Sequence, residues 1–78
     1  MKNHKVIVYS TTTCPYCVMA KEYLTEKGVV YEEKNVGLDR IAAQEMIEKS
    51  GQMGVPVVEI DGSIFVGFQP EEFDKVLN

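Results

Sequence analysis

The sequence predicts a single α/β domain over residues 1–78, with the element order β-α-β-α-β-β-α. Two observations lead to this prediction. Short β-branched segments alternate with helical ones in the first half of the chain, and an Asp61-Gly62 pair separates two further apolar segments near its end. A chain of this length buries about 60% of the surface that its unfolded form exposes, which leaves room for one modest core.

The first half of the chain predicts a strand, a helix and a second strand. The segment Val6–Tyr9 is β-branched and aromatic and too short for a helix, so we expect it to be the first, central strand. Pro15–Lys27 is rich in helix formers and begins with a proline, and Gly28 ends it. A second strand is expected over Val29–Val36, parallel to the first through a right-handed crossover. The buried stripe of the helix is expected to contain Cys17, Ala20 and Leu24.

The second half predicts a helix, a β-hairpin and a final helix. Asp39–Ser50 is expected to be helical, with Asp39 as the N-cap and Gly51 as the C-terminal glycine. Pro56–Ile60 and Ser63–Val66 are expected to pair as a hairpin, because the Asp-Gly turn between them supplies the positive φ that tight hairpins need. The expected inward stripes are Leu38, Ala42 and Met46 on the first of these helices, and Phe73, Val76 and Leu77 on the last, which opens at Pro70.

Charge and hydropathy exclude several classes of partner. The net charge is −4 at pH 7 and Lys and Arg are not clustered, so we expect no nucleic-acid partner. The apolar run at Val6–Tyr9 is shorter than the ~7–15 residues of a secretory signal core, so neither export nor a membrane span is expected. We therefore expect a cytoplasmic protein, taken as a monomer by default.

Cys14 and Cys17 are the two cysteines of the chain and form a Cys-x-x-Cys pair where the first helix should begin. In a reducing compartment such a pair is usually transient and catalytic rather than a structural disulfide. Unpaired N–H groups and the positive end of the helix dipole favour the thiolate, which is the nucleophile. Cys14 is therefore expected to attack a substrate disulfide, and the more shielded Cys17 to resolve the mixed disulfide. Zinc would need two further ligands, for which His4 is the one candidate, so no metal site is expected.

Two side chains near the cysteines have more than one reading. Tyr16 is either an aromatic side chain that shapes access to the nucleophile or an exposed second residue of a helix. Lys21, one turn past Cys17, is interpreted as a solvated surface lysine. The alternative is that Lys21 lends positive potential to the site.

The segment Cys14–Cys17, Cys-Pro-Tyr-Cys with Pro15 and Tyr16 as the active-site loop, resembles the active site of glutaredoxins of the thioredoxin superfamily. The resemblance spans nearly the whole chain. It implies a thioredoxin-like fold, a four-stranded mixed sheet flanked by three helices, with Val6–Tyr9 beside Pro56–Ile60. It also implies the reduction of disulfides and of glutathione mixed disulfides, with glutathione as the reducing co-substrate.

The resemblance further implies residues that bind the substrate. Residues 51–56, Gly-Gln-Met-Gly-Val-Pro, are similar to the glutaredoxin loop that ends in Thr-Val-Pro, whose proline is cis and faces the cysteines. Val55, before Pro56, would offer its backbone to the bound thiol as an added strand does. Gln52 matches a position that contacts the glycyl carboxylate of glutathione. The plainer interpretation is an ordinary loop before a strand.

The chain also departs from the glutaredoxin pattern. Thr11 replaces a common lysine three residues before the first cysteine, which removes a positive charge from the glutathione site. Residues 66–70, Val-Gly-Phe-Gln-Pro, replace the usual Gly-Gly followed by Asp and are similar to the Ser-Gly-Phe-Arg-Pro of NrdH-redoxins. Gly67 and Phe68 are therefore candidate binding residues. In the alternative interpretation Phe68 packs on the core and Gly67 makes a turn.

Three functions follow from these resemblances. The leading one is a thiol–disulfide oxidoreductase that is linked to glutathione or to a reductase and acts on disulfide-containing proteins. The alternative is an NrdH-type redoxin that takes electrons from thioredoxin reductase and gives them to a partner such as ribonucleotide reductase. The third is an iron–sulfur carrier that uses the first cysteine and glutathione. Pro15 opposes the third, since cluster-binding members usually have a smaller residue there.

Overall fold

The computed structural model describes residues 4–77 and has the predicted order of elements. The strands are β1 (Val6–Ser10), β2 (Glu32–Asn35), β3 (Val57–Ile60) and β4 (Ser63–Val66). The helices are α1 (Pro15–Glu26), α2 (Arg40–Ser50) and α3 (Pro70–Leu77). Residues 1–3 and 78, which the predicted domain includes, lie outside the described residues.

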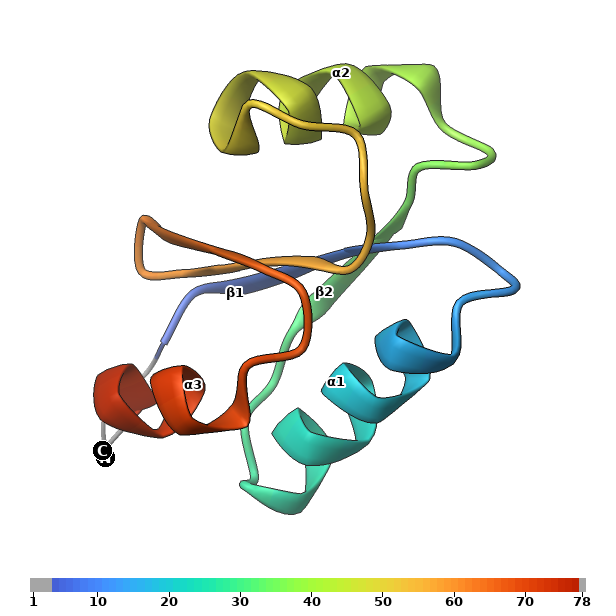
Figure 1. Ribbon diagram of the computed structural model, residues 1–78. Helices are drawn as coiled ribbons and strands as arrows, with labels where there is room; N and C mark the ends of the chain where they lie inside the picture. Colours follow the sequence, from blue (N-terminus) through green and yellow to red (C-terminus); the bar gives the residue numbers. More distant parts are fainter. Residues whose placement is uncertain (1–3, 78) are drawn as a thin grey trace.

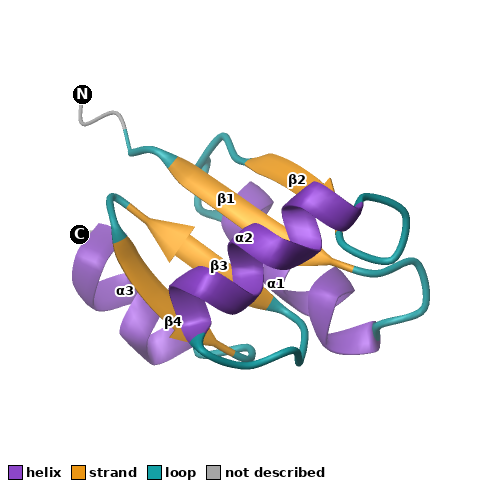
Figure 2. Ribbon diagram, turned by 90° about the horizontal axis from the view of Figure 1, so that it is seen from above, coloured by secondary structure: helices purple, strands orange, loops and turns teal. Residues whose placement is uncertain are grey.

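The four strands form one mixed sheet in the order β2-β1-β3-β4 (Figure 2). β1 pairs in parallel with β2 and antiparallel with β3, and β3 pairs antiparallel with β4. Val8, in the middle of β1, lies opposite Glu33 on one side and Val58 on the other. The predicted central strand, its pairing with the Pro56–Ile60 segment and the thioredoxin-like fold are therefore confirmed.

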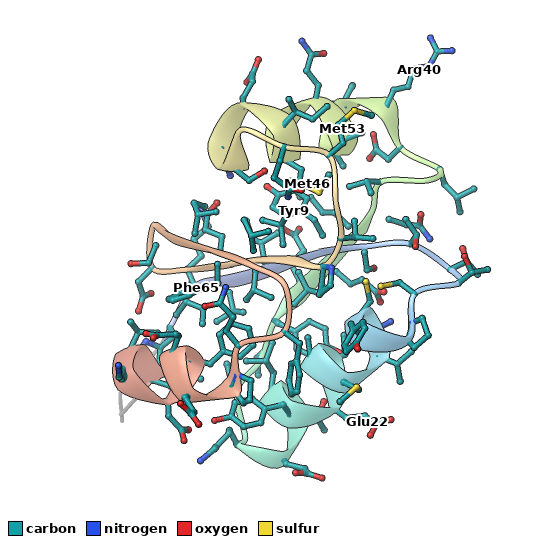
Figure 3. The ribbon with its side chains drawn as sticks, viewed as in Figure 1. Tyr9, Glu22, Arg40, Met46, Met53 and Phe65 are labelled. Atoms are coloured by element: carbon teal, nitrogen blue, oxygen red, sulfur yellow. The ribbon has the colours of Figure 1, made fainter. Side chains whose placement is uncertain are left out.

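Helices cover both faces of the sheet (Figure 1). Side chains of β1 alternate between two core clusters. One cluster lies on the side of α1 and α3, and the other lies under α2, where Tyr9 and Met46 meet (Figure 3). The buried members of the first are Val6, Val8, Ala20, Leu24, Val58, Ile60 and Phe73. Those of the second are Ile7, Tyr9, Ala42, Met46 and Val57. Because both faces are covered, every residue of β1 is buried.

The predicted caps are present. Asp39 accepts hydrogen bonds at its Oδ1 from the N–H groups of Ile41 and Ala42, at 3.0 and 3.1 Å. Gly51 ends α2 in the left-handed conformation, with φ of 74°. The Asp61-Gly62 turn of the hairpin also has positive φ at both residues. The sequence was sufficient to predict these caps and this turn, because each depends on groups only a few residues apart.

The predicted start of the second strand at Val29 is wrong, since β2 begins at Glu32. The N–H of Val29 donates to the carbonyl of Leu24, and the N–H of Gly28 donates to that of Thr25. These two bonds close the C-terminus of α1, which ends at Glu26 rather than Lys27. Because Val29 completes the end of the helix, strand pairing starts only after the chain has turned. At its other end β2 stops at Asn35, one residue before the predicted Val36.

The predicted burial of Leu38 is also wrong, since 85% of this residue is exposed. The N–H groups of Leu38 and Asp39 both donate to the carbonyl of Asn35, which forms a turn before α2. Leu38 therefore precedes the helix and does not share the stripe of Ala42 and Met46, both of which are buried.

Replacing Asp39 by alanine should lower the free energy of unfolding by about 1 kcal/mol, because two N–H groups at the start of α2 lose their acceptor. The Asp39→Asn variant keeps an acceptor oxygen and should lose much less. Urea unfolding followed by circular dichroism measures both variants. Equal losses in the two would contradict the cap, because they would assign the effect to the charge alone.

Candidate active site

Cys14 is the N-cap of α1 and adopts an extended backbone conformation. Its Sγ accepts a hydrogen bond from the N–H of Cys17 at 3.3 Å, so the sulfur takes the place that a Ser or Asp oxygen has in other caps. Pro15 is the first helical residue, where its missing N–H costs nothing. Cys14 itself is only partly buried. The helix therefore begins at the cysteines, as predicted, and directs backbone N–H groups toward an accessible sulfur.

Cys17 is fully buried one turn further along α1. Burial is the main reason that the pKa of the Cys17 thiol rises from 9.0 to about 11, and a hydrogen bond with the Cys14 side chain adds to it. The backbone of Thr11 and the charge of Lys21 act in the opposite direction. At neutral pH Cys17 is therefore a thiol beside Cys14. The two cysteines differ in environment as the sequence predicted.

The loop before β3 forms the other wall of the site. The Val55–Pro56 peptide bond is cis, as the resemblance implied, and Pro56 is buried. The Cys14 thiol lies 3.9 Å from the carbonyl oxygen of Val55 and donates to it. The Pro56 carbonyl in turn accepts from the N–H of Gly67 at 2.8 Å. Segments that are far apart in the sequence thus meet at Cys14.

The sequence model of the glutaredoxin family matches residues 6–65, which include both cysteines and the Val55–Pro56 loop. The chain belongs to the glutaredoxin family. It is a glutaredoxin-like thiol–disulfide oxidoreductase with a thioredoxin-like fold.

The chain is similar to a glutaredoxin-like relative and to two solved structures. It is 47% identical to a glutaredoxin-like 8.6 kDa protein in the rubredoxin operon of Clostridium pasteurianum, over 90% of this chain and 93% of that protein. The thioredoxin-like protein BC3987, known from a crystal structure, is 36% identical in sequence. Its structure matches with a TM-score of 0.87 over 92% of this chain and 99% of that chain. The glutaredoxin-like protein NrdH-redoxin from Escherichia coli is 24% identical, with a TM-score of 0.82 over 92% and 93% of the two chains, and shares the fold.

Gln52 and Thr11, at positions that bind glutathione in the family resemblance, contact other residues of the chain in this structure. The side-chain amide of Gln52 donates to the carbonyl of Gly54 at 2.9 Å and accepts from its N–H at 2.5 Å. Gln52 therefore folds back on its own loop. The side chain of Thr11 lies against Gly37, while its backbone contacts the sulfur of Cys17.

Gly67 and Phe68 each have a structural role in the fold. Gly67 has φ of +87°, which favours glycine, and makes the turn after β4. Phe68 packs edge-on against Tyr23 and Phe73, with ring centroids 6.1 and 6.2 Å apart. The structure thus places Phe68 on the core and Gly67 in a turn. Tyr16, in contrast, is 61% exposed beside the cysteines.

Lys21, interpreted from the sequence as a solvated surface lysine, is partly exposed, and its Nζ pairs with Glu33 at 2.7 Å. The same carboxylate oxygen of Glu33 accepts from the hydroxyl of Ser10 at 2.8 Å. Sequence reasoning missed Ser10 and Glu33. The available signal was a serine that directly follows four apolar strand residues, where a buried hydroxyl needs a partner.

Residues 4–77 hold neither a cluster of metal ligands nor a helix suited to a membrane. No three His, Cys, Asp or Glu side chains in this range are grouped so that they could hold a metal ion. Within the same range, no helix has the length and apolar character needed to cross a membrane.

Alkylation should distinguish the two cysteines. When the reduced protein meets limiting iodoacetamide at neutral pH, the label should be found on Cys14, because Cys17 is buried and its pKa is about 11. In the Cys14→Ser variant, labelling of Cys17 should still need a pH well above neutral, because burial continues to raise the pKa of Cys17. Peptide mass spectrometry measures both results. Labelling of Cys17 at neutral pH as fast as that of Cys14 would contradict this difference.

Proposed function

We propose that the chain reduces protein disulfides and mixed disulfides through a two-cysteine mechanism, with Cys14 as the nucleophile and Cys17 as the resolving residue. The observation that carries this proposal is the contrast between the two sulfurs. Cys14 is accessible and accepts the N–H of Cys17 at the helix start, whereas Cys17 is buried and protonated next to it.

In the first step the Cys14 thiolate attacks one sulfur of the substrate disulfide. A bond forms between Cys14 and that sulfur, the substrate S–S bond breaks, and the other substrate sulfur leaves as a thiolate that takes up a proton. The N–H of Cys17 and the start of α1 stabilise negative charge on Cys14 before the attack.

In the second step Cys17 loses its proton and its sulfur attacks Cys14. The bond between Cys14 and the substrate breaks, and the remaining substrate sulfur leaves as a thiolate and is protonated. The substrate has then gained two electrons and the protein holds a Cys14–Cys17 disulfide. The short separation of the two cysteines, three positions along one helix, favours this intramolecular displacement.

Val55 is the proposed binding element for the substrate backbone. Its carbonyl oxygen already lies beside the Cys14 thiol, and the loop is held by the bond from Gly67 to Pro56. A peptide or glutathione backbone can pair here as an added strand, which aligns its sulfur with Cys14. Tyr16, which is exposed next to Cys14 in the sequence, would line the approach.

Glutathione is the proposed reductant, in keeping with the family: two glutathione thiols would reduce the Cys14–Cys17 disulfide and leave as one glutathione disulfide. A reductase-linked, NrdH-type redoxin is the second candidate. Three observations favour it: Thr11 carries no charge, Gln52 is bound to Gly54, and residues 66–70 resemble a segment of NrdH-redoxins. The proposed partners are thus glutathione or thioredoxin reductase and disulfide-containing proteins in the cytoplasm.

Replacing Cys14 by serine should abolish turnover of a small disulfide, because no thiolate remains at the helix start. The matched Cys17→Ser variant should complete the first step and then accumulate one mixed disulfide per chain when no other thiol is present. Intact-mass spectrometry detects that adduct. Substantial turnover by the Cys14→Ser variant would exclude the proposed nucleophile.

The electron source should be decided by NADPH consumption with the same disulfide. Fast consumption through glutathione and glutathione reductase is expected for a glutathione-linked enzyme. Fast consumption only through thioredoxin reductase would establish the NrdH-type alternative. The Cys14→Ser variant serves as the control in both assays, since neither route should work without the nucleophile.

A further inference from the structure

A polar cluster lies between α1 and the edge of the sheet, next to the resolving cysteine. We define it as Ser10, Lys21 and Glu33, which belong to β1, α1 and β2. One oxygen of Glu33 accepts from the Ser10 hydroxyl at 2.8 Å and from Lys21 Nζ at 2.7 Å. Ser10 is fully buried, and the side chain of Lys21 is only 25% exposed. The cluster therefore fixes the position of a positive charge.

Lys21 and Cys17 lie on the same helix, α1. Lys21 follows Cys17 by four positions, so both side chains lie on the same face of α1. Ser10 directly precedes Thr11, whose backbone contacts the Cys17 sulfur. Burial raises the pKa of Cys17, and Lys21 is the positive side chain that acts against that rise.

We propose that Lys21, held by Glu33 and Ser10, is the positioning residue for the resolving step, where it stabilises the negative charge that develops on the Cys17 sulfur. The inference rests on the proposed two-cysteine function, because it concerns the second step of that mechanism. A buried thiolate without a nearby cation is costly. Lys21 offsets this cost while Cys17 remains a thiol in the resting protein.

Solvent reaches the cluster of Ser10, Lys21 and Glu33 from one side. A pocket of about 390 Å³ opens between α1 and β2, and Lys21 and Glu33 line it, so water reaches the cluster. In the resolving step Cys17 loses its proton to solvent, its sulfur bonds to Cys14, and the substrate sulfur leaves and is protonated. The pocket is lined by Val18, Lys21, Glu22, Thr25, Glu26, Tyr31 and Glu33.

The charge state of the cluster follows from its neighbours. Cys17 faces Cys14, Lys21 and the backbone of Thr11, and Lys21 faces Glu33 and Tyr31. The hydrogen bonds from Lys21 and Ser10 hold the pKa of Glu33 below its ordinary value, and the bond to Glu33 raises the pKa of Lys21. Both are charged at neutral pH, so Glu33 holds Lys21 and also reduces the positive potential at Cys17.

These two roles predict opposite effects of neutral substitutions. In Lys21→Gln the resolving step loses its cation and should need a higher pH. In Glu33→Gln the amide oxygen can still accept from Lys21 but carries no charge, so resolution should proceed at a lower pH. Lys21→Arg keeps the charge and should resemble the unmodified protein.

The test is a rapid-mixing experiment in which the reduced protein meets an aromatic disulfide that releases one coloured nitrothiobenzoate per displaced sulfur. The first release reports the attack by Cys14, and the second reports its displacement by Cys17. The rate of each phase is measured as a function of pH. Lys75→Gln, a change in an exposed lysine on α3, is the matched control for lost charge.

In Lys21→Gln the midpoint of the second phase should rise by about half to one pH unit, which slows resolution about threefold to tenfold at neutral pH. In Glu33→Gln the midpoint should fall. The first phase should keep its rate and amplitude in both variants, which also shows that they are folded.

Two outcomes would overturn the assignment of Lys21: an unchanged second-phase profile in Lys21→Gln, or upward shifts in both variants, which indicate a structural role only. Release of a single coloured thiolate by the unmodified protein is a different failure. It would reject the two-cysteine function itself, whereas two releases with no effect of Lys21 would reject only the present inference.

Discussion

The complete burial of β1 is the constraint on which the rest of the structure depends. The strand pairs with β2 on one edge and β3 on the other, and helices cover both of its faces, so all five of its residues are removed from water. Its β-branched and aromatic side chains supply both core clusters. Because the strand is fixed on every side, the loop that leaves it after Ser10 delivers Cys14 to one defined place beside β3.

One turn of helix then makes the two cysteines chemically unequal. The cap position leaves Cys14 outside the first turn, where its sulfur accepts the backbone N–H of Cys17. The position of Cys17 places its side chain on the buried face of α1 together with Ala20 and Leu24. Burial keeps Cys17 protonated at neutral pH, whereas Cys14, three residues earlier, is partly exposed.

The site is completed by groups from three other segments. The Val55–Pro56 loop approaches Cys14 from the side of β3, and the turn at Gly67 supports that loop. On the opposite side Glu33 of β2 joins Lys21 to Ser10. In the proposed function the Val55–Pro56 loop binds the substrate, and in the further inference the cluster of Lys21, Glu33 and Ser10 assists the reaction of Cys17. Both groups depend on the order of strands in the sheet, because β1 lies between β2, which carries Glu33, and β3, which follows the Val55–Pro56 loop.

The sequence by itself determined the features that depend on neighbouring residues: the cap at Asp39, the left-handed Gly51, the Asp61-Gly62 turn and the helix start at Pro15. Resemblance to a family added the cis Val55–Pro56 loop. Only the tertiary structure decided where pairing of β2 begins, that Leu38 is exposed, and that Lys21 is paired rather than free. The reason is that these depend on which strands become neighbours and in what register, whereas a cap or a turn needs only the hydrogen bonds of one short segment.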